Sequence, residues 1–385
     1  MTEAGLVPEP DTGYRIATIP GDGVGPEVIA AARRVVDMAG GRFGFAVDWS
    51  ECLVGGIAID TYGVPIRDED LADCGGADAI LLGAVGGPRW SDPNATIRPE
   101  QALFALRGGL GLYANVRPVR VQPTLAASSP VRPELLAGVD MVIVRELTGG
   151  VYFGERREPS GPAGDRSALD TLPYHEREIA RVVRLAFDLA RTRRGKVTQV
   201  DKANVLATSR LWRAVTNEIA IEYPGVVLNH QLVDSCAMLL IRRPADFDVI
   251  VTENLFGDIL SDEAAVLAGS LGVLPSASFG TRRTRHGLFG LYEPIHGSAP
   301  DIAGRDIADP IGTILSAAML LRTSLGRADA ADAVEAAVNR ALADGWRTAD
   351  LVDPHGATDG LAVVGTTGFA TAVIEALQAD AGMVA

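Results

Sequence analysis

Short apolar runs alternate along the chain with longer segments in which apolar residues recur every three or four positions. The short runs have the length and composition of β-strands, and the longer periodic segments are typical of amphipathic helices. Because helices separate several of the strands, we predict an α/β protein with substantially parallel strands. The predicted strands are residues 14–19, 43–49, 78–85, 139–146, 196–200, 225–233 and 247–252, and the predicted helices are residues 27–39, 176–194, 208–223, 311–323, 328–344 and 367–378.

Two polar segments interrupt this alternation. Residues 154–170, GERREPSGPAGDRSALD, are rich in glycine and proline and are predicted to form a loop. Residues 280–290, GTRRTRHGLFG, gather positive charge in an otherwise acidic protein, and a solvated loop is the favoured interpretation.

Size and charge limit the possible functions. The chain has 385 residues, of which 47% are apolar, so two compact units with a large core are expected. A net charge of −14 argues against broad binding to nucleic acid or to an anionic membrane, because both depend on clustered lysine and arginine. A local group of arginines can still bind a small anionic substrate.

The cysteines and the N-terminal segment indicate the compartment. Cys52, Cys74 and Cys236 have no metal-ligand spacing, which predicts buried, reduced thiols. Residues 1–14 are polar and contain two prolines, unlike a signal peptide, and no run is apolar enough to span a membrane. We therefore expect a cytoplasmic protein.

The stretch IPGDGVGPE follows the first predicted strand and opens the first predicted helix, where a dinucleotide-binding loop would lie. Its glycines, Gly21, Gly23 and Gly25, are one residue too closely spaced for the GxGxxG signature, and Pro26 follows them. Asp48 also lies further along the chain than the acidic residue of that signature should. The loop therefore does not match a Rossmann fingerprint.

The strongest chemical signal is NLFGDILSDEAAVLAGSLG. Asp258 and Asp262 are four residues apart in a helical pattern, so they share one face, one turn apart. A divalent cation would relieve their repulsion, and oxygen-only ligands favour Mg²⁺ or Mn²⁺. Asp234 in QLVDSCAM supplies a third carboxylate at a strand-to-helix junction. A solvated acidic face is the commoner explanation of such a pair, although apolar neighbours make it less suitable here.

Cationic and proton-transferring side chains supply the remaining candidates. Arg107, Arg117 and Arg145 stand in nearly apolar settings beside glycine or proline, and we expect them at strand ends, where guanidinium groups pair bidentately with carboxylates. Tyr152 follows two glycines. Lys202 follows a predicted strand and can act as a base if its pKa is lowered, whereas an ion pair with its neighbour Asp201 is the alternative.

Several longer motifs carry a family resemblance. In the order IPGDGVGPEV, LLGAVGGPRW, LYANVRPV, VRELTGGVYFGE, VDKANVL, FGDILSD, EPIHGSAPDIAG and GTILSAAMLLR, they extend from about residue 15 to about residue 377. With these motifs the chain resembles the metal-dependent β-decarboxylating dehydrogenases of the isocitrate/isopropylmalate dehydrogenase family.

The resemblance implies an α/β, isopropylmalate-dehydrogenase-like two-domain fold, with a mixed, largely parallel sheet flanked by helices, rather than a Rossmann fold. It implies a discontinuous NAD-binding domain of residues 1–113 plus 269–385. Residues 114–268 would form a central domain that holds the metal and catalytic residues and the dimer interface.

The same resemblance implies NAD-dependent oxidation of a 2-hydroxy acid, followed by loss of its β-carboxylate. Lys202 would take the hydroxyl proton and Tyr152 would protonate the enol. Lys202 and Asp234 would come from the partner subunit, which implies a homodimer with shared active sites. Arg107, Arg117 and Arg145 would hold the substrate carboxylates, and Asp234, Asp258 and Asp262 would bind Mg²⁺ or Mn²⁺.

The implied coenzyme is NAD, since Asp301 stands where family members that use NADP carry lysine. A carboxylate there would accept from both ribose hydroxyls and repel a 2′-phosphate. Asp309 replaces the usual asparagine of an Asn-Pro pair that touches adenine, and residues 281–290 precede the adenosine loop. The other residues expected near the coenzyme are Glu293, His296, Gly297, Ser298 and Ala299.

The substrate depends on the helix PEQALFALR, whose face after Glu100 would meet the variable group of the substrate. Leu103 and Phe104 are apolar, which favours an alkyl group over the γ-carboxylate of isocitrate. We therefore expect 3-isopropylmalate, the substrate of a step in leucine biosynthesis. Malate, tartrate, homoisocitrate or another alkylmalate is the alternative, and a non-catalytic ligand-binding subunit is a third interpretation.

Overall fold

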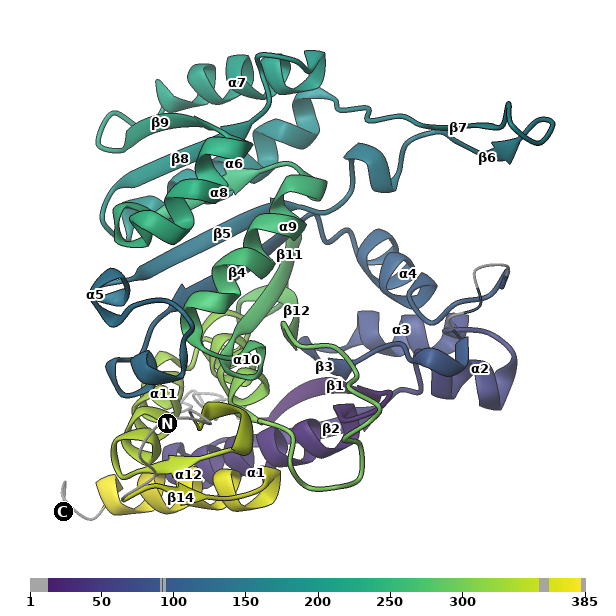
Figure 1. The fold of residues 1–385 in the computed structure, drawn as a ribbon. Helices are drawn as coiled ribbons and strands as arrows, with labels where there is room; N and C mark the ends of the chain where they lie inside the picture. The colour runs from purple at the N-terminus through teal and green to yellow at the C-terminus, as the bar shows by residue number, and fades with distance from the viewer. Residues whose placement is uncertain (1–12, 91, 93–94, 353–359, 382–385) are drawn as a thin grey trace, which may run out of the picture.

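The computed structural model describes residues 13–90, 92, 95–352 and 360–381. Most of the polar N-terminal segment, residues 1–12, lies outside the described residues. Figure 1 shows one long sheet flanked by helices on both faces, with a two-stranded ribbon that projects from the body. The strands are β1 Gly13–Gly21, β2 Ala46–Glu51, β3 Ala79–Ala84, β4 Ala114–Arg120, β5 Asp140–Glu146, β6 Arg156–Ser160, β7 Ser167–Asp170, β8 Lys196–Asp201, β9 Val227–Leu232, β10 Val249–Thr252, β11 Pro275–Arg283, β12 Leu288–Pro294, β13 Trp346–Arg347 and β14 Ala362–Val363.

Helices fill most of the connections between the strands. None of the helices in the described ranges is both long enough and apolar enough to cross a membrane. The helices are α1 Gly25–Phe43, α2 Gly56–Tyr62, α3 Asp68–Gly76, α4 Gln101–Gly109, α5 Pro133–Leu136, α6 Glu176–Arg191, α7 Ala207–Ala220, α8 Val233–Arg242, α9 Asn254–Ala265, α10 Ile311–Thr323, α11 Ala328–Ala343 and α12 Thr366–Ala381.

The ten-stranded sheet has the order β2-β1-β3-β12-β11-β4-β5-β10-β8-β9. Pairs that involve β11 with β12, β11 with β4, and β4 with β5 are antiparallel, and the other six pairs are parallel. The predicted mixed, largely parallel α/β sheet is confirmed, and its strand order is not that of a Rossmann fold.

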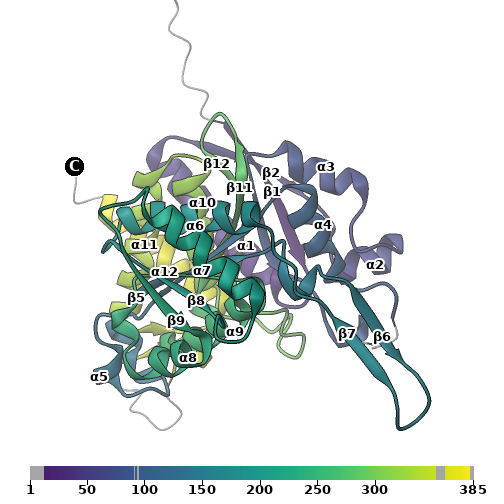
Figure 2. The ribbon, with the colours of Figure 1, turned by 90° about the horizontal axis from the view of Figure 1, so that it is seen from above.

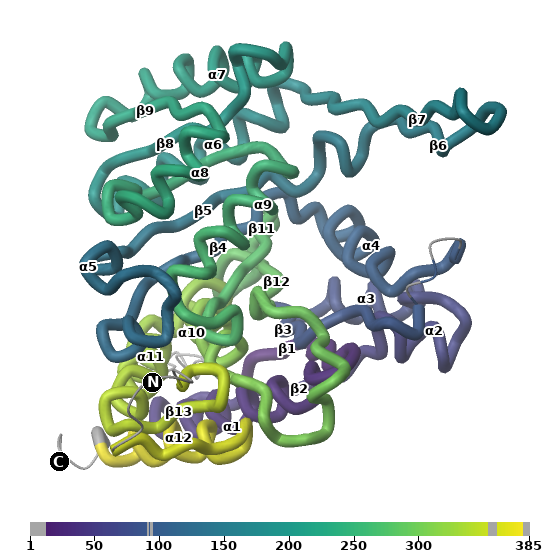
Figure 3. Tube along the Cα trace, viewed as in Figure 1, coloured from purple at the N-terminus to yellow at the C-terminus, as the bar shows by residue number. Residues whose placement is uncertain are grey.

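The two faces of the sheet have different coverings. Side chains on one face form a continuous core with α1, α6, α7, α10, α11 and α12. The opposite face carries two separate cores, one with α3 and α4 and one with α8 and α9. Figure 3 shows α9 across the central strands, where it packs on β4 and β5, and α4 to one side of them, beyond β12. The gap between these two cores is where the candidate site lies.

The two segments predicted as loops are mostly strand. Residues 154–170 form the antiparallel ribbon of β6 and β7, which extends away from the body in Figure 2. Residues 280–290 contain the end of β11, a short turn and the start of β12. Both loop predictions were wrong, because glycine, proline and charge are tolerated in exposed hairpins, such as the separate ribbon of β6 and β7 and the outer end of the β11–β12 hairpin. The strands β4, β11 and β12 were not predicted.

The strands and helices that were predicted agree closely with the observed ones. Each predicted strand overlaps an observed one, and the long periodic segments are α1, α6, α7, α10, α11 and α12. All three cysteines are buried and free, as predicted. Cys52 and Cys74 belong to the same core, although they lie 22 positions apart along the chain. Their spacing in the sequence did not predict this proximity.

Candidate active site

Helix α9 presents the paired aspartates to the centre of the sheet. Glu253 caps the helix, because its carboxylate accepts hydrogen bonds from the backbone N–H groups of Leu255 and Phe256, at 3.1 and 2.7 Å. Asp258 and Asp262 then lie one turn apart, as the spacing predicted, and their side chains are 34% and 66% exposed. Both carboxylates therefore remain accessible to a ligand.

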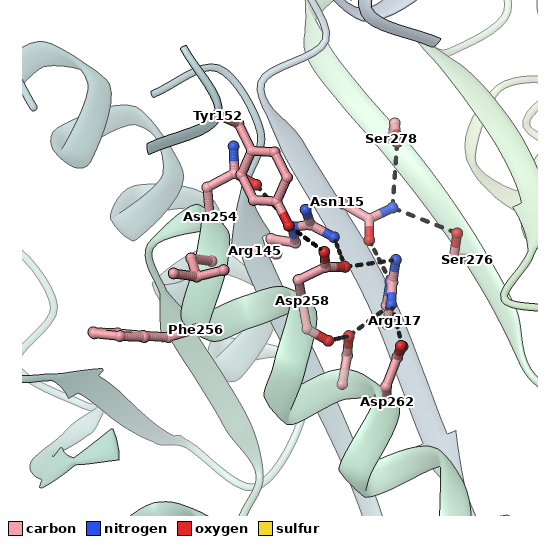
Figure 4. Close-up of polar contacts among 12 residues, drawn as sticks. Asn115, Arg117, Arg145, Tyr152, Asn254, Phe256, Asp258, Asp262, Ser276 and Ser278 are labelled. Atoms are coloured by element: carbon pink, nitrogen blue, oxygen red, sulfur yellow. Dashed lines mark hydrogen bonds and ion pairs between the residues drawn. The ribbon is translucent and has the colours of Figure 1, made fainter. Parts of the chain in front are cut away.

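Asp258 is the centre of the polar cluster drawn in Figure 4. Its Oδ2 accepts a hydrogen bond of 2.7 Å from the Tyr152 hydroxyl, and its Oδ1 accepts one from Nη1 of Arg145. A second cation, Nη2 of Arg117, lies 4.0 Å from Oδ1. Tyr152, Arg145 and Arg117 are therefore all grouped around the carboxylate of Asp258.

Arg145 is a buried cation at the end of β5. The residue is only 5% exposed, and its Nε donates to Oδ1 of Asn254 at 2.9 Å. Burial lowers the pKa of Arg145, Asp258 opposes that shift, and the charges of Arg117 and Arg107 add to it. The three guanidinium groups therefore lie within electrostatic reach of one another, and together they form a concentrated site for anionic groups.

Arg117 is fixed from both sides. Its Nε donates to Oδ1 of Asn115 at 2.7 Å, and its Nη1 donates to Ser261 at 2.6 Å and to Asp262 at 3.2 Å. Asn115 is in turn held by Ser276 and Ser278 of β11, at 3.4 and 3.2 Å. The antiparallel strands are therefore what aims this guanidinium.

The predicted placement of the arginines at strand ends holds only for Arg145. Arg117 is the fourth of seven residues in β4, and Arg107 belongs to α4. Glycine and proline neighbours suggested strand ends, but Pro118 is accommodated within β4 and the glycines after Arg107 end a helix.

Arg107 connects the arginine cluster to the predicted coenzyme loop. Its Nη2 lies 3.3 Å from Oε1 of Glu293, and both side chains are mostly buried. The Nε of Arg107 is buried and has no hydrogen-bond partner. An unsatisfied buried N–H is costly, so this position favours an additional acceptor such as a carboxylate.

An aromatic wall stands beside Tyr152. Phe104 of α4 is 40% exposed and packs edge to face on Phe153, with ring centroids 5.7 Å apart. Leu103 points into the core with α3 and α4, and Glu100 is exposed beside Gly86. Of the three residues predicted on this helix, Phe104 is the exposed apolar one, and it packs on Phe153, the neighbour of Tyr152 in the chain.

Two buried glutamates, Glu146 and Glu253, lie next to residues of the site, and sequence reasoning missed both. Glu146 is fully buried beside Arg145 and accepts from Thr148 and Gly149. The hydroxyl of Tyr174 lies 3.4 Å from both Glu146 and Glu253. Burial raises the pKa of both glutamates. The sequence did show that each glutamate stands at or directly after the end of a buried strand. That position does not reveal which side chain the glutamate contacts.

Lys202 and Asp234 form a separate group. The Nζ of Lys202 donates to Oδ1 of Asp234, and this bond lowers the pKa of Asp234. The alternative pair of Lys202 with Asp201 is not formed, because Asp201 is buried and accepts from Arg213 at 2.8 and 2.9 Å. Within the described part of the chain, no three acidic, histidine or cysteine side chains are grouped to hold a metal. A single chain therefore does not bring Asp234 to Asp258 and Asp262.

The glycine loop packs against protein rather than opening toward a phosphate. A Cβ on Gly21 would lie 1.9 Å from the carbonyl oxygen of Ala84, and a Cβ on Gly23 would lie 1.8 Å from that of Ser298. The N–H of Val24 donates to the same Ser298 oxygen at 2.8 Å. The loop is thus a close-packed support for residues 295–302, in agreement with its failure to match the Rossmann fingerprint.

The predicted coenzyme residues form an open turn with unsatisfied polar groups beside it. Asp301 is exposed, Gly297 is exposed, and Ala299 has a positive φ of 38°. Nε2 of His296 and Oδ2 of Asp309 are buried without hydrogen-bond partners. Burial raises the pKa of Asp309 well above its ordinary value, so this carboxyl favours its neutral form.

Comparison with known proteins identifies the family of this chain. The family model described as isocitrate/isopropylmalate dehydrogenase matches residues 15–373. A 3-isopropylmalate dehydrogenase of Anaeromyxobacter dehalogenans is 57% identical over 88% of this chain and 94% of its own length. One from Geobacillus kaustophilus is 56% identical over 89% of this chain and 91% of its own.

Solved structures give the same result for the fold. The crystal structure of an isocitrate dehydrogenase from Methylococcus capsulatus superposes with a TM-score of 0.81, at 36% sequence identity, and the match covers 95% of this chain and 99% of that one. With its fold and nearly its whole length matched, this chain belongs to the isocitrate/isopropylmalate dehydrogenase family of decarboxylating dehydrogenases.

Proposed function

We propose that this protein oxidises (2R,3S)-3-isopropylmalate with NAD⁺ and releases CO₂ and 4-methyl-2-oxopentanoate, a step of leucine biosynthesis. The observation that carries the proposal is the group of Arg107, Arg117 and Arg145. Phe104, which packs on Phe153, precedes Arg107 by three residues on α4 and therefore lies about one helical turn from it. A malate with two carboxylates and an alkyl group presents the complementary charges and surface. The highly identical relatives named for this activity support the same substrate.

The chain's own groups suit the proton transfers of this reaction. The C2–H bond would give its hydride to NAD⁺ while Nζ of Lys202, brought by the second subunit, takes the hydroxyl proton, and the bond to the β-carboxylate would then break. Burial, and then the bond to Asp258, raises the pKa of Tyr152, so its hydroxyl keeps a proton near neutral pH. We propose that Tyr152 delivers this proton to C3 of the resulting enol.

A divalent cation fits the donors on α9. Asp258 and Asp262 offer only carboxylate oxygens, the ligands that Mg²⁺ and Mn²⁺ prefer, and we propose Asp234 of a second subunit as the third. Such a cation would supply Lewis-acid polarisation of the substrate oxygens. Arg145 and Arg117 would exchange their present partners on α9 for the carboxylates of the substrate.

NAD⁺ fits the open turn that follows β12. The exposed carboxylate of Asp301 makes no hydrogen bond or ion pair within the described ranges, which leaves both oxygens free for ribose hydroxyls. Because neutral Asp309 has an O–H donor, it can replace the amide of the asparagine usual at this position. Glu293, His296, Gly297, Ser298 and Ala299 complete the proposed coenzyme surface.

A homodimer would complete the site. Apolar side chains on α8 and α9 are left uncovered in one chain: Met238, Ile241 and Ile259 are 61%, 38% and 58% exposed. Contiguous apolar surface on neighbouring helices favours a protein partner. We propose that a second copy covers these helices and brings its Lys202 and Asp234 to Asp258 and Asp262.

We further propose the domain division at the antiparallel strands. Residues 1–113 plus 269–385 would form the NAD-binding domain, and residues 114–268 would form the central domain. The pairing of β11 with β4 is the seam between them.

The direct test is NADH formation from 3-isopropylmalate, NAD⁺ and Mg²⁺ or Mn²⁺. Lys202→Met should abolish turnover but preserve NAD⁺ binding, whereas Lys196→Met, which alters the lysine at the start of β8, should retain turnover. Malate, tartrate, isocitrate and homoisocitrate are measured in parallel, and the proposed substrate should have the highest kcat/KM. A higher kcat/KM for any other malate, or full activity in the Lys202 variant, would contradict the proposal.

A further inference from the structure

A cavity of about 480 Å³ lies on the sheet face opposite the candidate active site. It is bounded by β4 and β5 on one side and by α10 and α11 on the other. Its size is within the range of small-molecule sites. The apolar side chains that line it include Leu125, Val142, Leu274, Leu315, Met319 and Leu342.

The alternation of side chains along β4 and β5 separates this cavity from the active site. Arg117 and Arg145 point to the face covered by α9, where they contact Asp262 and Asp258. Arg120 and Val142 are an odd number of residues away on the same strands, so they point to the other face and line the cavity. The cavity is therefore not an extension of the proposed substrate or NAD site.

Two of the three arginines that line the cavity are already paired. Arg193 lies 2.7 Å from Asp140 and 2.8 Å from Asp248. Arg322 lies 2.7 Å from each of two carboxylates of α11, Asp332 and Glu335. Each carboxylate that lines the cavity is therefore paired with an arginine, although Arg322 is shared between two of them.

Arg120, the last residue of β4, is different. It is exposed at the cavity rim, and within the described residues its side chain makes no hydrogen bond or ion pair. Its guanidinium can form two parallel hydrogen bonds to a carboxylate without displacing a partner. An apolar interior with one uncompensated cation at its rim is complementary to a small molecule with an alkyl body and one negative charge.

We propose that this cavity is a second binding site, for a small amphipathic monocarboxylate whose alkyl chain fills the interior and whose carboxylate pairs with Arg120. A dianion is less well suited, because the carboxylates of α11 outnumber Arg322 two to one and repel a second negative charge. Because its walls come from both sides of the proposed domain seam, an occupant would hold β4 and β5 against α10 and α11.

The test is calorimetric titration of the full-length protein with octanoate. Acetate, which keeps the charge, and octanamide, which keeps the chain, are the matched ligand controls. We expect saturable octanoate binding, much weaker binding of both controls, and a rise in melting temperature with octanoate concentration. Binding should persist at saturating NADH and 3-isopropylmalate, since the site is separate.

Two variants locate the site. Arg120→Gln, at an exposed position, should weaken octanoate binding about tenfold, the usual scale for loss of one charge-assisted pair. Leu315→Trp should abolish binding by filling the interior, and its melting curve reports whether it folds. Arg283→Gln, another exposed arginine, is the control and should bind normally. No saturable binding, equal binding of octanoate in Arg120→Gln and the wild type, or competition by 3-isopropylmalate would overturn the proposal.

Discussion

Replacement of Asp309 by asparagine should stabilise the protein, and the gain should increase with pH. Asp309 is 6% exposed, its Oδ1 accepts from the backbone N–H of Ile311 at 2.8 Å, and its Oδ2 is buried without a partner. Burial, and to a lesser extent the charge of Asp350, raises its pKa well above the ordinary value of 3.8. The folded protein therefore holds this proton more tightly than the unfolded chain does.

The sign and size of the effect follow from proton linkage. Below pH 3.8 both states carry the proton, so the stability that the neutral form contributes is fully present. As pH rises toward the folded pKa, the unfolded chain ionises first, and unfolding becomes easier by about 1.4 kcal/mol per pH unit. At about 2.1 cal/mol/K per residue, 385 residues give an unfolding entropy of about 0.8 kcal/mol/K. The wild type should thus lose about 2 °C of melting temperature per pH unit relative to Asp309→Asn.

The assay is thermal unfolding of both proteins from pH 4 to pH 8 in a buffer of constant ionic strength. Asp329→Asn is the matched control of opposite sign. Arg327 donates to Asp329 at 2.9 Å and lowers its pKa, so that ion pair stabilises the protein at neutral pH and is lost on acidification. A difference between Asp309→Asn and the wild type that does not change with pH, or that shrinks as pH rises, would refute the reasoning.

Three further substitutions test other parts of the site. Tyr174→Phe removes the hydroxyl that bridges two buried glutamates and should cost about 1–3 kcal/mol of unfolding free energy in urea, whereas Tyr113→Phe, with no hydroxyl bond in the described residues, should be nearly neutral. Gly257→Ala places a Cβ 2.7 Å from Cγ of Arg145. Because this contact would displace Arg145, the variant should have a higher KM for 3-isopropylmalate. Gly41→Ala is the control, because a Cβ there would meet open space on α1. It should raise the unfolding free energy by up to about 1 kcal/mol, and with it the melting temperature. Phe104→Leu shortens the apolar wall and leaves more room in front of it, so it should shift relative kcat/KM toward longer 3-alkylmalates about tenfold or more. An unchanged ranking in the kinetic panel would remove Phe104 from the pocket.

Local pattern was sufficient for the elements that are buried on one face. The apolar period of Glu176–Arg191 predicted α6 almost to the residue, and the four-residue spacing of Asp258 and Asp262 placed both on one face of α9. Where side chains serve the site instead of the core, the pattern failed. The strand β4 carries Arg117 and Pro118 in its centre. These residues interrupt the alternation of apolar and polar positions, so the segment was not predicted as a strand.

Long-range contacts were outside the reach of sequence reasoning. Asn115 aims Arg117, and Tyr174 connects Glu146 with Glu253, but these partners come from separate elements and leave no local periodicity. The ribbon of residues 154–170 was mistaken for a loop for the same reason, since its strands pair with each other and bury almost nothing.

The sequence by itself determined the α/β class, the helix and strand positions that depend on apolar period, and the residue types needed for an anionic substrate and a divalent cation. Only the tertiary structure decided which of these groups meet. It joins Arg145, Arg117 and Tyr152 at Asp258, leaves Lys202 paired with Asp234 elsewhere, and packs the glycine loop against Ser298. The physical reason is that periodicity records which face of an element is buried, whereas the partner across that face is set by strand order and register.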